Sequence, residues 1–176
     1  MKINYKIEAA DFLAFQLFTA STDDIIQKRK RKSRFFYSVL FGMASVFCIV
    51  NDTLFVGIYF GILAITMALF YPHFFRWRYK KQYANFIERN YSKRFGEPAQ
   101  LEFTKDFIYS KDKVADGKVK LSEIESIHET ALHFFIKMGS GMSFILPKRE
   151  LESIDLFKET IQQLGLKIVD AHDYKL

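Results

Sequence analysis

Apolar residues along the chain form one long stretch that almost lacks charge. Residues 35–75 carry a single formal charge, on Asp52, and the stretch divides at the tripeptide 51–53. As helices, residues 35–50 would span roughly 24 Å and residues 54–75 roughly 33 Å, and a bilayer core is about 30 Å thick. A chain of 176 residues is too small to bury two helices that are apolar on every side. The pattern therefore predicts a transmembrane helical hairpin with spans 35–50 and 54–75 and a turn at 51–53.

The segments on either side of this hairpin show strand and helix periodicity. Residues 2–7 alternate between polar and apolar side chains, as in a short strand, and a helix is expected from about Ala10. After the second span, a helical stripe of aromatic residues ends before Gly96 and Pro98. We therefore expect three parts in this half of the chain: an N-terminal strand and helix over 1–34, the hairpin over 35–75 and a juxtamembrane helix over 76–98.

From residue 99 the apolar period changes to two, which is typical of strands. About six short strands are expected, with a tight turn at 139–141, and a helix that stops at Gly165 follows them. This pattern predicts a small cytosolic domain of the α+β class over 99–176, an antiparallel β meander closed by a C-terminal helix. Because the two faces of a strand alternate, two groups of side chains are expected: Leu132, Phe134, Ile136 and Phe144 in the core, and His133 and Lys137 in solvent.

Basic residues flank the hairpin on both sides. Residues 1–81 hold 12 Lys and Arg against 5 Asp and Glu, whereas residues 82–176 hold 14 against 15. Cytoplasmic segments next to membrane spans carry such an excess, and anionic lipid head groups attract it. We therefore expect both termini in the cytosol, the turn 51–53 outside, and a lipid rather than a nucleic-acid surface. The expected membrane-interface residues are Lys28, Arg29, Lys30, Arg31, Lys32, Arg34, Arg76, Trp77, Arg78, Lys80 and Lys81.

Small residues recur along both spans at helical spacing. The second span contains a GxxxG motif, and small side chains let helix backbones approach closely in lipid. Two uses of these residues are open: packing of the two spans against each other, which the short turn favours, or formation of a homodimer. The expected helix-packing residues are Ser38, Gly42, Ser45, Gly57, Gly61, Ala64 and Ala68.

The order of these parts resembles the YcxB-like family of bacterial membrane proteins. The segment 119–127 (VKLSEIESI) is similar to the element of that family, and of bacterial pleckstrin-homology (PH) domains, in which SEI lies between two strands. The segment 144–149 (FILPKR) resembles the family's motif before the last helix. The resemblance implies a PH-like fold for the C-terminal domain and a setting in the bacterial inner (plasma) membrane, and it implies no activity.

Few residues suggest catalysis or ligand binding. A single cysteine, Cys48, excludes an internal disulfide and a cysteine-based zinc site. We expect no catalytic, cofactor or metal site, although His128 and His133 could approach each other on adjacent strands. Lys148 and Arg149 precede a predicted helix N-terminus, where anions bind readily, and form a weak candidate for an anion site.

Three functions remain open on this basis. The leading hypothesis is a membrane-anchored PH-like binding module, not an enzyme, which recognises a protein partner at the membrane surface. The first alternative is an enzyme or enzyme regulator that uses the sheet face near His128 and His133. The second is a structural membrane subunit that assembles through the GxxxG helix.

Overall fold

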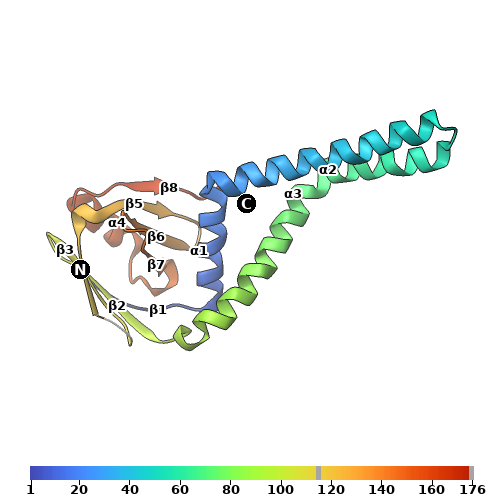
Figure 1. Cartoon of the computed structure of the whole chain (residues 1–176). Coiled ribbons are helices and arrows are strands. Elements are labelled where there is room, and N and C mark those ends of the chain that lie inside the picture. Colours follow the sequence, from blue (N-terminus) through green and yellow to red (C-terminus); the bar gives the residue numbers. More distant parts are fainter. Residues whose placement is uncertain (114–115, 175–176) are drawn as a thin grey trace. The chain divides into compact units, whose positions relative to one another are not determined.

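The computed structural model describes residues 1–113 and 116–174, and it has the α+β class expected from the sequence (Figure 1). The chain forms two compact units. We call residues 17–83 the hairpin unit, and residues 1–16 together with 84–174 the domain unit. The helices are α1 (Ala9–Thr22), α2 (Asp24–Val50), α3 (Leu54–Tyr91) and α4 (Ile154–Gln163), with short 3-10 turns at Ser92–Arg94, Leu121–Glu123 and Lys148–Glu150.

The domain unit contains two four-stranded sheets. In the first sheet β1, β2, β3 and β4 are neighbours in that order and all antiparallel, and in the second the order is β7-β6-β5-β8, with β8 parallel to β5. The strands are β1 (Lys2–Lys6), β2 (Pro98–Phe103), β3 (Phe107–Lys111), β4 (Asp116–Lys120), β5 (Ile124–Glu129), β6 (His133–Met138), β7 (Ser143–Pro147) and β8 (Ile168–Asp170). The six strands expected after residue 98 are present, and β8 is an additional strand that the sequence did not indicate.

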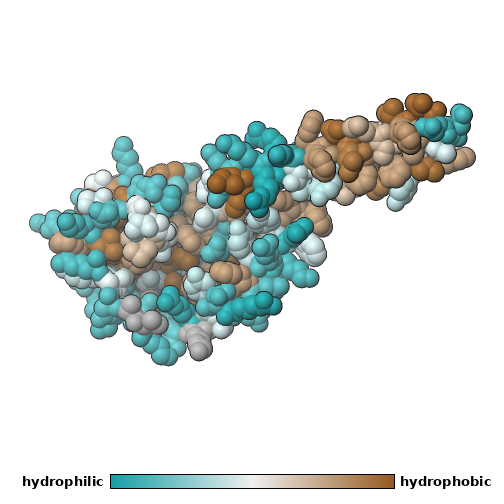
Figure 2. Space-filling view, viewed as in Figure 1, coloured by the Kyte–Doolittle hydropathy of each residue, from teal (hydrophilic) through white to brown (hydrophobic). Residues whose placement is uncertain are grey.

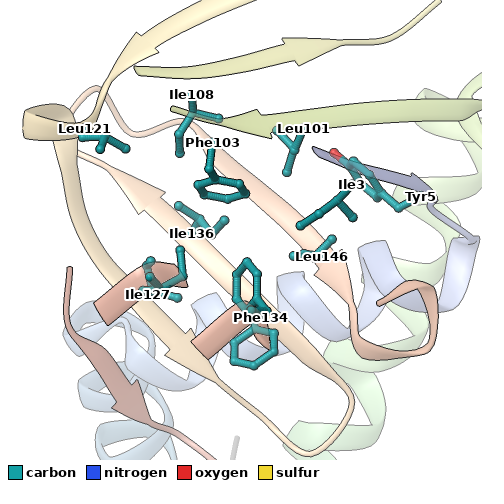
Figure 3. Packing of buried hydrophobic residues seen from close by; sticks show 12 residues of the cluster. Ile3, Tyr5, Leu101, Phe103, Ile108, Leu121, Ile127, Phe134, Ile136 and Leu146 are labelled. Carbon is teal, nitrogen blue, oxygen red and sulfur yellow. The ribbon is translucent and has the colours of Figure 1, made fainter. Parts of the chain in front are cut away.

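The domain core lies between the two sheets and α4. Alternate residues of the first sheet, such as Leu101 and Ile108, point toward Phe134 and Ile136 of the second sheet (Figure 3). Phe157 of α4 packs against the Phe134 ring, with 4.7 Å between the ring centroids. All five side chains are fully buried, so the expected core positions Phe134 and Ile136 are confirmed.

The first strand of the domain comes from the other end of the sequence. β1 pairs along its whole length with β2, and Ile3 and Tyr5 are buried in the core. The domain unit therefore begins at residue 1 rather than at residue 99, and the hairpin unit is inserted between its first and second strands. Sequence periodicity identified the strand over 2–7 but could not assign it to a sheet, because strand partners are not encoded locally.

The expected faces of β6 are wrong at two positions. Leu132 is 70% exposed because it lies in the turn before β6, and His133 is 5% exposed rather than in solvent. The cause is α1, whose Phe15 contacts Phe135 on the second face of β6 with 5.4 Å between the ring centroids. Both faces of this strand are covered, so alternation does not separate core from solvent. Lys137 is exposed as expected, and Phe144 is half-buried against the core.

In the hairpin unit the turn lies where it was predicted, whereas the two helices extend beyond the predicted spans 35–50 and 54–75. α2 ends at Val50 and α3 begins at Leu54, so the turn lies at 51–53, where Asp52 adopts a left-handed backbone conformation (φ 57°). The Thr53 hydroxyl and backbone N–H both donate to the Cys48 carbonyl and close this turn. The segment 76–98, expected as a separate helix, continues α3 without interruption through Pro72 and ends at Tyr91.

Candidate functional site

The surface of the hairpin unit is apolar along most of its length. Both α2 and α3 are long and apolar enough to cross a membrane, and only 6% of the most apolar part of each is buried inside the protein. Large side chains such as Phe47 (69% exposed), Phe55 (87%) and Leu69 (66%) point outward. Figure 2 shows the hydrophobic colour over this helix pair, with hydrophilic residues near its turn. An exposed apolar surface of this extent marks a membrane or protein interaction site.

The expected membrane-interface residues lie next to this apolar surface. The basic residues before the first span form the first half of α2, and those after the second span continue α3. All of them except Lys30 have exposed side chains, and the Lys81 ammonium group lies 5.6 Å from the centre of the Trp77 ring. The arrangement supplies positive charge and an aromatic ring at one end of the apolar helices, as interface residues do.

The small residues of the spans make one close contact inside the hairpin. Ser45 is buried on α2, and its hydroxyl donates to the carbonyl of Gly57 on α3 at 2.7 Å. A Cβ atom on Gly57 would lie 2.5 Å from Ile49 Cγ1, and one on Gly61 would lie 3.2 Å from Ser45 Oγ. These residues therefore pack the two helices of one chain against each other.

Other predicted packing residues lie outside this contact. A Cβ atom on Gly42 would have no neighbour within 4 Å, and the Ser38 hydroxyl donates to the Arg34 carbonyl of its own helix. Ala64 and Ala68 are half-buried on α3. The row of packing residues predicted on the first span is therefore shorter in the structure, and it centres on Ser45.

A buried cluster of charged groups lies inside the domain unit. Asp11 of α1 is 1% exposed. Its Oδ1 atom is 2.7 Å from His133 Nε2, and the Arg149 guanidinium donates to both carboxylate oxygens at 2.8 and 2.7 Å. The backbone N–H of Glu8 also donates to the carboxylate, at 2.7 Å. The cluster connects the first turn of α1 with β6 and with the turn after β7.

These contacts stabilise the ionised form of Asp11. Burial by itself would raise the pKa of this carboxyl, but hydrogen bonds from Arg149, His133 and the Glu8 N–H hold its pKa well below the usual range. The Arg149 pKa is raised, chiefly by the hydrogen bonds with Asp11. Sequence reasoning missed this cluster because Asp11 lies 122 and 138 residues from its partners. The only local signal was an acidic residue in the first turn of a predicted helix.

The weak anion-site candidates are also involved in ion pairs within the domain. Arg149 binds Asp11, and Lys148 Nζ lies 2.7 Å from Glu129 Oε1, which Lys158 also contacts at 2.8 Å. The Glu129 pKa is lowered because these two hydrogen bonds outweigh the effect of burial. Both basic residues therefore have carboxylate partners in the same chain, which weakens the interpretation of this pair as an anion site.

His128 and His133 have different partners in the structure. His133 contacts Asp11, whereas His128 Nε2 lies 2.9 Å from Ser126 Oγ on the same strand. Burial and the nearby Lys137 lower the His128 pKa. Within residues 1–113 and 116–174, no group of three or more His, Cys, Asp or Glu could hold a metal ion.

A groove of about 650 Å³ opens on the domain unit and is lined by residues of both sheets. Its walls include Gly117, Lys118 and Val119 of β4 and Ser143, Phe144 and Ile145 of β7. Residues of α1 and aromatic side chains such as Tyr5 and Tyr91 complete the apolar lining. Burial, with the Asp112 charge as a second cause, raises the pKa of Tyr5 to about 12. Cavities of this size bind small molecules or peptide side chains.

Fold and surface together define the class of the protein as an α+β domain that carries a long apolar helical hairpin. Residues 103–161, about a third of the chain, match the model of the family described as YcxB-like protein, which confirms the resemblance inferred from the sequence. The match runs from the end of β2 into α4 and leaves out β1, α1, α2 and α3. Comparison with curated proteins and with solved structures gives no significant match.

Proposed function

We propose that this protein is a two-span membrane protein that holds a PH-like binding module at the cytosolic face of the bacterial inner membrane. The observation that carries the proposal is the exposure of the hairpin: its apolar side chains lie on the protein surface, where water would solvate them poorly. Insertion into a bilayer removes this surface from water. The basic residues on one end of the hairpin then contact anionic lipid head groups on the cytosolic side.

The domain unit is the part that would recognise a protein partner. Two largely antiparallel sheets with a closing C-terminal helix agree with a PH-like fold, and a module of this kind binds through its open sheet edges and grooves. Membrane anchoring raises the local concentration of any partner that is also bound to the membrane. The groove between β4 and β7 is the best candidate for this interaction because it is apolar and accessible.

The two alternative functions have less support. A catalytic site near His133 would need an accessible imidazole, whereas this side chain is buried and bound to Asp11. The groove also does not include His128 or His133. A structural subunit that forms a homodimer through its GxxxG helix would need the surface of Gly57 and Gly61, which Ser45 of the same chain already contacts.

Cysteine labelling in intact cells tests the anchoring and its orientation. In a Cys48→Ser background, Asp52→Cys is expected to react with a membrane-impermeant maleimide, because the turn faces the outside. Lys2→Cys in the same background should react only after the cells are permeabilised. Labelling at position 2 and protection at position 52 would contradict the proposed orientation, and recovery of the chain in the soluble fraction would contradict the anchoring.

Site-specific photocrosslinking tests recognition of a protein partner. A photoreactive benzoylphenylalanine at Lys113, which lines the groove, is expected to give a discrete protein adduct in cells. The same group at Lys137, an exposed residue of β6 outside the groove, is the matched control. Equal adducts at both positions, or none at Lys113, would count against a binding role for the groove.

A further inference from the structure

Two strand edges face the groove of the domain unit. Within residues 1–113 and 116–174, β4 pairs only with β3 and β7 only with β6, so each is the last strand of its sheet in the described part of the chain. The groove is lined by consecutive residues of both strands, 117–119 and 142–145. Both strands therefore border the groove, and within the described residues each has one edge without a partner strand. An open sheet edge is a template for another strand.

The hydrogen-bond pattern identifies the backbone groups on these edges. The Leu121 N–H donates to the Asp106 carbonyl at 2.9 Å, one residue pair beyond the β3–β4 ladder. Because bonded pairs alternate in an antiparallel ladder, Lys118 and Lys120 direct their N–H and carbonyl groups away from β3. The Met138 N–H donates to the Met142 carbonyl, one residue pair beyond the β6–β7 ladder. By the same alternation, the backbone groups of Ser143 and Ile145 point away from β6.

The other end of the first sheet is protected. The N–H of Lys6, which lies on the outer edge of β1, donates to Glu150 Oε2 at 3.3 Å. The outer edge of β7 carries Pro147, which has no N–H to offer. On β4, Lys118 and Lys120 both keep outward N–H and carbonyl groups, and Lys118 lines the groove. A strand that pairs with β4 would therefore also contact the groove's apolar lining.

The side chains around β4 define the chemistry of such a strand. On the groove side, Gly117 of β4 lies opposite Ser110 of β3 and has no side chain. The Ser110 side chain occupies the adjacent space, since a Cβ atom on Gly117 would lie 2.7 Å from Ser110 Oγ. On the other side of the sheet, Lys118 and Lys120 are exposed, and Lys118 Nζ lies 3.8 Å from the centre of the Phe107 ring. A strand with apolar side chains toward the groove and acidic side chains toward these lysines complements both faces.

We propose that β4 binds an extended segment of a partner protein, with alternating apolar and acidic residues, by adding it as a fifth strand to the first sheet. This inference rests on the proposed function as a partner-binding module and specifies the kind of partner. Backbone hydrogen bonds to Lys118 and Lys120 supply affinity, and the apolar lining of the groove supplies specificity.

Selection from a library of phage-displayed random 12-residue peptides tests this inference. Full-length protein in detergent is the target, and phage that bind the Lys118→Pro variant are removed first. Proline at this position deletes an outward N–H and no bond of the β3–β4 ladder, so the sheet is expected to remain folded. Enriched peptides should alternate apolar and acidic residues. Failure to enrich any peptide after this subtraction would overturn the proposal.

Matched variants then separate backbone pairing from side-chain effects. A labelled synthetic copy of an enriched peptide should bind Lys118→Pro at least tenfold more weakly than the wild type, and Lys118→Ala, which keeps the N–H, within about threefold. Met142→Asp, which adds a negative charge to an exposed residue of the groove, should also weaken binding. Leu132→Asp, in an exposed turn outside the groove, should not. Equal binding by Lys118→Pro and Lys118→Ala would refute strand addition.

Two further measurements address other occupants and the fold. A dimer of the wild type that is lost in Lys118→Pro would assign the edge to a second copy of this chain and overturn the proposal. The second probe is a fluorescent fatty acid. If it binds saturably and equally to the wild type and to Lys118→Pro, and blocks peptide binding, the groove binds a lipid and the proposal is overturned. Hydrogen exchange of the β6 amides checks that Lys118→Pro is folded. Normal labelling at position 52 without any peptide binding would reject strand addition and leave the membrane anchor intact.

Discussion

The two units of the chain place the same kinds of side chain in opposite environments. Phe134 and Phe157 of the domain unit are completely buried, whereas Phe47 and Phe55 of the hairpin unit are 69% and 87% exposed. In the domain, apolar residues alternate with polar ones and find partners within the chain. In the hairpin they surround both helices, and the chain alone cannot cover them. An apolar residue therefore indicates burial, but the pattern around it indicates whether the chain itself can cover that residue.

The two units also differ in the polar groups that they bury. The domain encloses a complete ionic cluster, in which Asp11 has four hydrogen bonds from three residues. The hairpin encloses a single hydroxyl, that of Ser45, which has one bond to a backbone carbonyl. The domain fixes its elements by many specific polar contacts, whereas the two hairpin helices pack through small residues and through aromatic pairs such as Phe41 and Phe60. The following substitutions compare the two units.

The largest expected effect is the removal of a core phenylalanine from the domain. Phe134→Ala should lower the free energy of unfolding of the domain by about 3–5 kcal/mol, since it leaves a cavity between the sheets. Phe47→Ala in the hairpin should change it by less than about 0.5 kcal/mol, because its side chain is exposed. Hydrogen exchange of the β6 amides in detergent-solubilised protein measures both values. Equal effects would show that the two units do not differ as described.

The second effect concerns the ionic cluster. Asp11→Ala should lower the free energy of unfolding of the domain by about 3 kcal/mol, because it leaves a buried imidazole and a guanidinium without their carboxylate. Asp24→Ala, an exposed acidic residue in the first turn of α2, is the control in the other unit and should cost no more than about 1 kcal/mol. The same exchange measurement applies. A loss below about 1 kcal/mol for Asp11→Ala would mean that the cluster contributes little.

The cluster also predicts how stability depends on pH. The pKa of Asp11 is lower in the folded protein than in the unfolded chain, so the unfolded chain binds more protons in acid. The stabilisation by Asp11 is complete above the ordinary aspartate pKa of about 4 and is lost progressively as the pH falls below it. Asp11→Asn should reduce this loss in a urea titration of the domain between pH 5 and 3. An unchanged pH dependence in the variant would contradict the ion pair.

The third effect concerns the close contact between the two hairpin helices. Gly57→Ile should destabilise the hairpin by about 1–3 kcal/mol, because its new side chain meets Ile49 and the backbone of α2. Gly61→Ile should act in the same direction and lower protein yield, without separating a stable dimer, whereas Gly42→Ile should be tolerated. Thermal unfolding in detergent and crosslinking in membranes measure these outcomes. A wild-type dimer that disappears in Gly61→Ile at unchanged yield would instead support a structural subunit.

The smallest effect is the loss of one hydrogen bond in the hairpin. Ser45→Ala should cost about 0.6 kcal/mol, the typical value for a single interhelical bond within a membrane. Ser38→Ala, whose hydroxyl binds its own helix, should cost less. Thermal unfolding of the two variants in the same detergent makes the comparison. A larger cost for Ser38→Ala would mean that Ser45 is not the centre of the helix contact.

Local patterns predicted most elements and the organisation of the hairpin. The turn at 51–53 follows from one charged residue between two apolar runs, and the strands after residue 98 follow from alternation and from glycines at the turns. The candidate sites were less predictable. Asp11 has partners more than a hundred residues away, and the groove combines residues 5–16 with residues between 91 and 145. Neither is visible in a short window because each depends on which elements lie side by side.

The sequence by itself determined that two long apolar helices meet at a turn over 51–53, because the length and uniformity of an apolar run are properties of neighbouring residues. Only the tertiary structure decided that β1 belongs to the same sheet as β2, that α1 buries His133 on the second face of β6, and that β4 and β7 border a groove. The first two features arise from contacts between residues about a hundred positions apart. Their energies depend on packing in three dimensions, and alternation along a single strand contains no information about a helix that covers its other face.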